Sequence, residues 1–206
     1  MYIPDKKVVF VQIPKCASTS MLSAISSRFE VNLLGAHVTM RQYVNRFPEA
    51  IRGISVVRNP VDRLVSAVNF TVGKYYKKSE IHKIKFDIES SLGERQKPIH
   101  LSLFYPQYSF LMSNTPLSLY TLPNASLCLS DLGAEGKIPC LNRSFNNISK
   151  SEVIECFGES FIKDFYLVDH VLYSEVESVG HGFMSIPDAT NYFHSARGKN
   201  AGKIFL

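Results

Sequence analysis

The chain has 206 residues, a formal net charge of +5, and 45% hydrophobic and 20% charged residues. These values are ordinary for a soluble globular protein, and the length predicts a single domain, residues 1–206, that buries a sizeable core. No window holds the ~18 uncharged apolar residues of a membrane span, and Met1 lies too close to the first predicted strand for a signal peptide. The sequence therefore predicts a cytoplasmic protein without a membrane partner.

The basic balance, with a pI of 9.0, suits an anionic ligand but does not distinguish a nucleotide, a nucleic acid and an acidic glycan. The four cysteines form no CxxC pair and have no metal-like spacing with histidine; they are Cys16, Cys128, Cys140 and Cys156. We therefore expect reduced thiols and no metal site.

The first segment with a clear pattern runs from Val8 to Phe29. Val8–Ile13 is a short apolar, β-branched run that is typical of a buried strand, and Pro14 ends it. A helix then begins near Thr19, because apolar residues follow at helical spacing: Met21, Leu22, Ile25 and Phe29.

The turn between this strand and this helix has the features of an anion-binding site. Its residues are mostly small and carry hydroxyls and one positive charge: Lys15, Cys16, Ala17, Ser18, Thr19 and Ser20. Unpaired N–H groups and the positive end of the helix dipole face the turn, so we expect a phosphate group there. It is not a Walker A loop, because the lysine comes first and no glycine lies between Val8 and Gly35. The alternative is an ordinary strand–turn–helix with a solvated Lys15.

A second anion-binding segment follows a second predicted strand, Ile54–Val57. Asn59 is a predicted N-cap and Pro60 takes the first position of the next helix. Arg58 thus lies at the carboxyl end of a strand, and Ser66 lies on the helix face away from the apolar residues. Ligands of open α/β sheets bind at this edge, so Arg58 and Ser66 predict a second phosphate site. The alternative is a capped amphipathic helix with a solvated arginine.

Periodicity and capping signals predict the remaining elements. They are a short helix over 40–47, a helix within 74–97, a third strand over 117–122, a helix over 150–162 and an irregular tail over 179–206. Ser149 and Glu152 form a predicted capping box at the start of the helix over 150–162. Together the elements predict a single-domain, P-loop-like α/β fold with a mostly parallel central sheet flanked by helices.

The two anion-binding segments together resemble the cofactor site of the sulfotransferases. IPKCASTS is similar to their 5′-phosphosulfate loop, and RNPVDRLVSAVNF is similar to their 3′-phosphate segment, with an arginine after a strand and a serine eight residues on. The resemblance is to the carbohydrate (Golgi-type, family 2) branch and its 2-O-sulfotransferases. It implies the donor 3′-phosphoadenosine-5′-phosphosulfate, the product adenosine 3′,5′-bisphosphate and a hydroxyl acceptor on a carbohydrate, with no metal and no nucleic acid.

The same resemblance assigns further residues. LGAEGKIPCLNRS is similar to a family stretch near the nucleotide, which places Arg143 and Ser144 at the cofactor. AHVTMRQY is similar to the 2-O-sulfotransferase segment H-G-H-V, which makes His37 the general base, although Gly35 stands where the first histidine would be. The alternative for His37 is a hydrogen-bonded structural role. Lys15 is then the catalytic cation, placed to contact the bridging oxygen of the donor as it becomes negative.

Two other functions are consistent with the sequence. A P-loop nucleotide or small-molecule kinase would need a glycine-rich Walker loop and a Walker B aspartate for Mg²⁺, and the sequence shows neither. A nucleotide-binding or glycan-binding module without activity would keep the same fold. That alternative stays open because the segment LYTLPNAS lacks the glutamate that often follows the third strand in the family, and because only one histidine of the H-G-H-V segment is matched.

Overall fold

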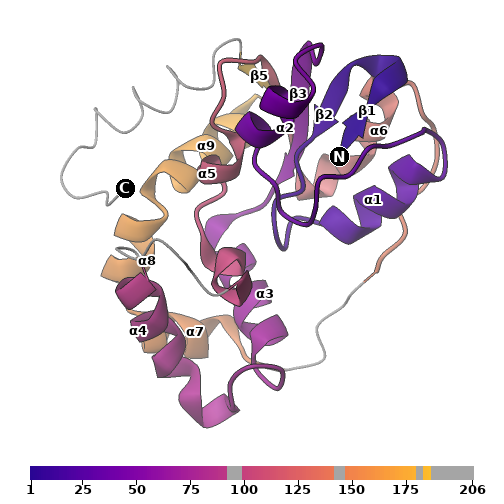
Figure 1. The fold of residues 1–206 in the computed structure, drawn as a ribbon. Coiled ribbons are helices and arrows are strands. Elements are labelled where there is room, and N and C mark those ends of the chain that lie inside the picture. The colour runs from indigo at the N-terminus through magenta and orange to yellow at the C-terminus, as the bar shows by residue number, and fades with distance from the viewer. Residues whose placement is uncertain (92–98, 142–146, 180–182, 187–206) are drawn as a thin grey trace.

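In the part of the chain that the structure describes, five strands form one sheet, and neighbours in space are also neighbours in the chain (Figure 1). The computed structural model describes residues 1–91, 99–141, 147–179 and 183–186. The strands are β1 (Tyr2–Ile3), β2 (Val8–Phe10), β3 (Arg52–Val57), β4 (Leu117–Thr121) and β5 (Phe183–Ile186). Strands β2, β3 and β4 run parallel, whereas β1 and β5 pair antiparallel at the two edges. The predicted α/β class is confirmed.

Helices cover both faces of the sheet, because the strand residues alternate between two apolar layers. Helices α1 (Ser18–Ser26) and α6 (Ala125–Asp131) pack on the layer that contains Val8, Phe10, Ile54, Val56 and Tyr120. Helices α2 (Met40–Arg46), α5 (Tyr108–Leu111) and α9 (Leu167–Ser178) pack on the layer that contains Val9, Val11, Val57, Leu117 and Leu119. In such a sheet the ligand-binding edge is the one where the parallel strands end.

A second group of helices packs beyond the carboxyl end of β3 (Figure 1). It consists of α3 (Pro60–Thr71), α4 (Ile81–Ser91), α7 (Lys150–Phe157) and α8 (Glu159–Phe165), and its own core includes Leu64, Val68, Ile84, Ile88 and Phe157. Short 3₁₀ helices connect larger elements: η1 (Pro4–Lys6), η2 (Lys78–Glu80), η3 (Ile99–Phe104) and η4 (Leu122–Asn124). Because α3 begins directly after β3, this group meets the sheet at the ligand-binding edge. No helix within the described ranges is long and apolar enough to cross a bilayer.

Several elements begin as the capping signals predict. The side-chain oxygen of Asn59 accepts hydrogen bonds from the N–H groups of Val61 (3.0 Å) and Asp62 (3.3 Å), as expected for an N-cap. Ser149 and Glu152 form the predicted capping box at the start of α7. The predicted helix over 40–47 and the strands predicted over 54–57 and 117–122 correspond to α2, β3 and β4.

Three predicted segments are wrong at one end or in part. The strand predicted to reach Ile13 ends at Phe10. The helix predicted over 150–162 breaks at Gly158, whose φ of +80° separates α7 from α8. In the tail predicted to be irregular, residues 183–186 form β5, because pairing with β4 supplies hydrogen bonds that no local pattern reveals.

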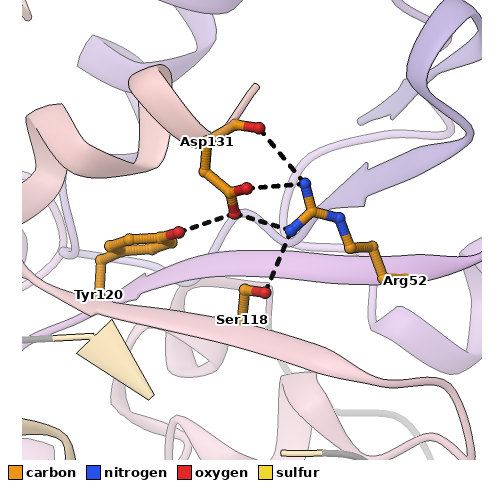
Figure 2. Close-up of polar contacts among 4 residues, drawn as sticks. All are labelled: Arg52, Ser118, Tyr120 and Asp131. Carbon is orange, nitrogen blue, oxygen red and sulfur yellow. Dashed lines mark hydrogen bonds and ion pairs between the residues drawn. The ribbon is translucent and has the colours of Figure 1, made fainter. Parts of the chain in front are cut away.

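An ion pair joins α6 to the sheet at the end of β3 opposite the ligand-binding edge (Figure 2). The guanidinium of Arg52 donates to both carboxylate oxygens of Asp131, at 2.7 and 2.9 Å. The Tyr120 hydroxyl donates to the same carboxylate (2.7 Å), and Ser118 Oγ accepts from Arg52 (3.3 Å). Burial alone would raise the pKa of Asp131, but the hydrogen bonds from Arg52 and Tyr120 outweigh it and hold the pKa below its usual value.

The Asp131→Asn substitution is expected to lower the free energy of unfolding by about 1–2 kcal/mol near neutral pH, because a partly exposed bidentate pair is lost. The pKa of Asp131 is lower in the folded than in the unfolded chain, so its contribution is complete above the usual value of 3.8 and is lost as the pH falls through the folded-state pKa. Urea unfolding of both proteins at pH 7 and pH 3 measures this. If the two proteins differed in unfolding free energy by the same amount at pH 7 and pH 3, the role given to the ion pair would be contradicted.

Candidate functional site

A cavity of about 600 Å³ opens at the edge of the sheet where β2, β3 and β4 end. Lys15 reaches it from the loop after β2, Arg58 from the residue after β3, and Leu122 from the residue after β4. The parallel pairing of the three strands brings these positions together, although the chain separates them widely. The volume is within the range of small-molecule sites. We call this cavity the main cavity.

The 14–20 segment forms one wall of the main cavity. Lys15 and Ala17 adopt left-handed backbone conformations, with φ of 64° and 57°, in positions that usually favour glycine. Each such residue costs on the order of 1 kcal/mol, which the surrounding structure must offset. Ala17 is the N-cap of α1 and has no side chain that can cap the helix, and the residues of the first turn, Ser18 to Ser20, line the cavity.

The Lys15 side chain lines the main cavity and reaches α3. Its Nζ is 4.1 Å from the centre of the Phe70 ring, on the neighbouring helix α3. Burial and the positive charge of Arg58 lower the pKa of Lys15 to about 8. At neutral pH the ammonium is therefore still mostly charged, but it is poorly solvated and would gain from a nearby anion.

Arg58 and Ser66 form another part of the main-cavity wall. Arg58 Nη1 donates to the backbone carbonyl of Lys15 at 3.4 Å, and the charge of Arg58 is near enough to lower the pKa of Lys15. Gln107 holds the backbone of Arg58: Oε1 accepts from the Arg58 N–H (2.9 Å) and Nε2 donates to the Arg58 carbonyl (2.8 Å). Ser66 lines the same cavity from α3. A guanidinium and a hydroxyl make this part of the wall suitable for a phosphate group.

Cys16 points away from the main cavity, into the layer beneath the 14–20 segment. Its thiol donates to Gln107 Oε1 at 3.2 Å, the same oxygen that accepts from Arg58. Asp169 on α9 is fully buried and accepts from the backbone N–H groups of Gln107 (2.7 Å) and Tyr108 (3.0 Å). Gln107 therefore connects the loops after β2 and β3, and Asp169 fixes Gln107.

Arg63 is fully buried in the same layer. Its guanidinium donates to the carbonyls of Pro14 (3.4 Å) and Leu103 (3.0 Å), and also to those of Phe104 and Tyr105. These bonds join the start of the 14–20 segment to η3. Four backbone acceptors and the nearby Asp169 carboxylate offset part of the cost of burying this charge, although Arg63 Nε has no hydrogen-bond partner among the described residues.

His37 lies at another part of the main-cavity wall, in the connection between α1 and α2. It also has a left-handed backbone, with φ of 57°. Its Nδ1–H donates to the Gln12 carbonyl at 3.0 Å, which leaves the lone pair of the neutral ring on Nε2. Burial lowers the pKa of His37, the bond to Gln12 opposes this, and the charges of Lys15 and Arg63 lower it further. The ring is therefore neutral at pH 7 and able to accept a proton.

The structure brings most of the predicted site residues together. Those that line the main cavity are Lys15, Ala17, Ser18, Thr19, Ser20, His37, Arg58 and Ser66. Cys16 is not part of this lining, because its side chain is buried against Gln107. Arg143 and Ser144 lie outside the described residues.

Sequence reasoning missed other residues of the main-cavity wall. They are Asp62, Val65, Asn69, Phe70, Leu103, Leu122, Cys140 and Leu141. Asp62, Val65, Asn69 and Phe70 lie three or four residues apart on α3, on the same face as Ser66. This spacing could have predicted which face of the helix lines the cavity. The buried support from Arg63 and Asp169 has no comparable signal.

The comparisons with known proteins give no assignment: no protein-family model, curated protein or solved structure matches the chain. Among the described residues, no group of three or more His, Cys, Asp and Glu side chains is placed to hold a metal ion.

Proposed function

We propose that the protein is a sulfotransferase that uses 3′-phosphoadenosine-5′-phosphosulfate and acts on a hydroxyl acceptor. One observation carries the proposal: two cations, a helix N-terminus and a neutral histidine converge on one cavity at the ends of parallel strands. The unit formed by β2, the 14–20 segment and α1 also supports a P-loop-like fold. The carbohydrate nature of the acceptor rests on the sequence resemblance alone.

The residues of the main cavity match the chemical groups of the donor. Lys15 and the first turn of α1 would hold the 5′-phosphosulfate, and Arg58 with Ser66 would hold the 3′-phosphate. The bound donor supplies an activated sulfuryl group. In the transfer, the acceptor oxygen forms a bond to sulfur and the bond from sulfur to the bridging oxygen breaks, with its electron pair left on the phosphate. His37 Nε2 takes the hydroxyl proton, and Lys15 stabilises the charge on the phosphate.

Calorimetric titration tests the nucleotide specificity. We expect adenosine 3′,5′-bisphosphate to bind much more tightly than AMP or ATP, and Mg²⁺ to leave its affinity unchanged. The Arg58→Ala variant is expected to lose about 1.5–3 kcal/mol of binding free energy for the bisphosphate, the value of a charged hydrogen bond, while its affinity for AMP stays nearly the same.

Arg41→Ala is the matched control, because Arg41 is an exposed arginine that does not line the main cavity. If the unmodified protein bound AMP and the bisphosphate equally well, the assignment of a 3′-phosphate site and of the donor would be wrong. Tighter, Mg²⁺-dependent binding of ATP would favour a kinase. Normal bisphosphate binding without turnover on any acceptor would favour a binding module.

His37→Ala is expected to bind the bisphosphate normally and to lose about 10²–10⁴-fold in turnover, the usual contribution of a general base. In the unmodified enzyme, kcat/KM should fall on the acid side with a midpoint below the ordinary imidazole pKa of 6.5, because burial lowers the pKa of His37. A pH–rate profile and a thermal melt on one preparation measure both. A variant that melts earlier but keeps its specific activity would give His37 only a structural role.

A further inference from the structure

A second cavity, of about 400 Å³, adjoins the main cavity. The two share Ser18, Thr19 and His37 in their linings. The other described residues that line the second cavity are Gln12, Leu22, Leu33, Gly35 and Ala36. A molecule in the second cavity would therefore lie beside both the 14–20 segment and the imidazole of His37.

Gln12 gives the second cavity a polar group that is ready to bind. The residue is only 7% exposed, and its backbone carbonyl already orients His37. Its side-chain amide has no hydrogen-bond partner within the described part of the chain. A ligand that both donates and accepts a hydrogen bond would pair well with an amide in this position.

Away from Gln12 and the shared residues Ser18, Thr19 and His37, the described lining of the second cavity is apolar. Leu22, Leu33 and Ala36 contribute hydrocarbon, and none of the described residues that line this cavity carries a charge. Leu33 is 52% exposed, so its side chain is accessible to a ligand in this cavity. The main cavity differs, because Lys15, Arg58 and Asp62 line it. The main cavity therefore suits a charged part of a ligand, and the second cavity suits an uncharged, apolar part.

We propose that the second cavity binds the acceptor, and that the acceptor is a neutral alcohol or phenol with an apolar body rather than an acidic glycan. The inference rests on the proposed sulfuryl transfer. The apolar body packs against Leu22, Leu33 and Ala36, and the Gln12 amide hydrogen-bonds to a polar group of the acceptor. The acceptor hydroxyl lies at His37, which accepts its proton when the oxygen–sulfur bond forms.

Ligand-detected NMR with 2-naphthol as the neutral aryl alcohol and methyl β-D-glucuronide as the anionic sugar tests this without any turnover. The unmodified protein is expected to bind 2-naphthol in preference to the glucuronide. Leu33→Asp should weaken 2-naphthol binding by about tenfold or more, because a carboxylate is placed against the apolar body. Leu34→Asp is the matched control: Leu34 is the neighbouring residue, is 40% exposed and does not line the second cavity. Gln12→Leu should weaken binding several-fold at similar volume.

Bisphosphate titration of the same variants separates this inference from the proposed function. Normal bisphosphate affinity in Leu33→Asp with weakened 2-naphthol binding supports both. Preference for the glucuronide, or equal loss of 2-naphthol binding in Leu33→Asp and Leu34→Asp, overturns the acceptor assignment and leaves the donor site intact. Binding of 2-naphthol by a protein that does not bind the bisphosphate overturns the acceptor role together with the proposed function.

Discussion

Lys15→Ala is expected to reduce kcat by about 10²–10³-fold, the usual cost of removing one group that stabilises charge in a transition state. Its affinity for adenosine 3′,5′-bisphosphate should fall much less, because the strongest interaction of Lys15 is with charge that develops on the leaving phosphate. In the proposed complex the backbone of the 14–20 segment also holds the phosphate, and this contact does not depend on the lysine side chain. Single-turnover rates and calorimetry on the same variant separate the two effects. A raised KM with unchanged kcat would contradict the catalytic role.

The Lys15→Arg variant tests the same catalytic role through the pH dependence of kcat/KM. The pKa of Lys15 is lowered to about 8, so the free enzyme loses this positive charge as the pH rises through 8. With His37 on the acid side, kcat/KM should follow a bell-shaped profile in the unmodified enzyme. An arginine stays charged throughout, so the alkaline limb should disappear in the variant. An alkaline limb that persists in Lys15→Arg would assign it to another group.

Arg63→Met is expected to be the most destabilising of these substitutions, at about 3–5 kcal/mol, because it leaves a buried charge and several carbonyls without compensation. Four carbonyls lose their donor, and Asp169 loses the positive charge that stabilises its carboxylate. Urea unfolding measures the loss. Any folded fraction should also bind the bisphosphate weakly, since the Pro14 carbonyl no longer has its partner.

Arg46→Met is the matched control, because Arg46 is exposed at the end of α2 and its removal should change stability by at most about 0.5 kcal/mol. Pairing Arg63→Met with Asp169→Leu should cost less than the sum of the two single changes, because the pair replaces two coupled charges. A loss below about 1 kcal/mol in Arg63→Met would show that the buried guanidinium is not needed for the fold.

The parts of the site that the sequence predicted are those controlled by local physics. Hydroxyls at a helix start and the Asn59 cap can be recognised in a few neighbouring residues. The structure places Lys15, Arg58 and Ser66 around one cavity, as expected for an α/β sheet. The position of His37 beside them also agrees with the prediction. The catalytic roles of these residues stay predictions.

The parts that sequence reasoning missed depend on contacts between distant segments. Cys16 belongs to the right turn, yet its side chain faces Gln107 because left-handed residues on both sides of it turn it inward. Arg63 reads as an ordinary charged residue on a helix, and only the approach of η3 makes it a buried donor. Similarly, β5 exists because β4 offers an unpaired edge, not because its own sequence demands a strand.

The hydrogen bonds of Gln107 also determine when the site can form during folding. They link residues 91, 49 and 62 positions apart in the chain, to Cys16, Arg58 and Asp169 respectively. Contacts of such long range form only after the loops between them have closed, which is slow compared with helix formation. Helices α1 and α3 can therefore appear early in refolding, while the proposed nucleotide site is expected to form last. Ligand affinity would then report on completion of the whole fold, because no fragment that ends before α9 contains every member of this network.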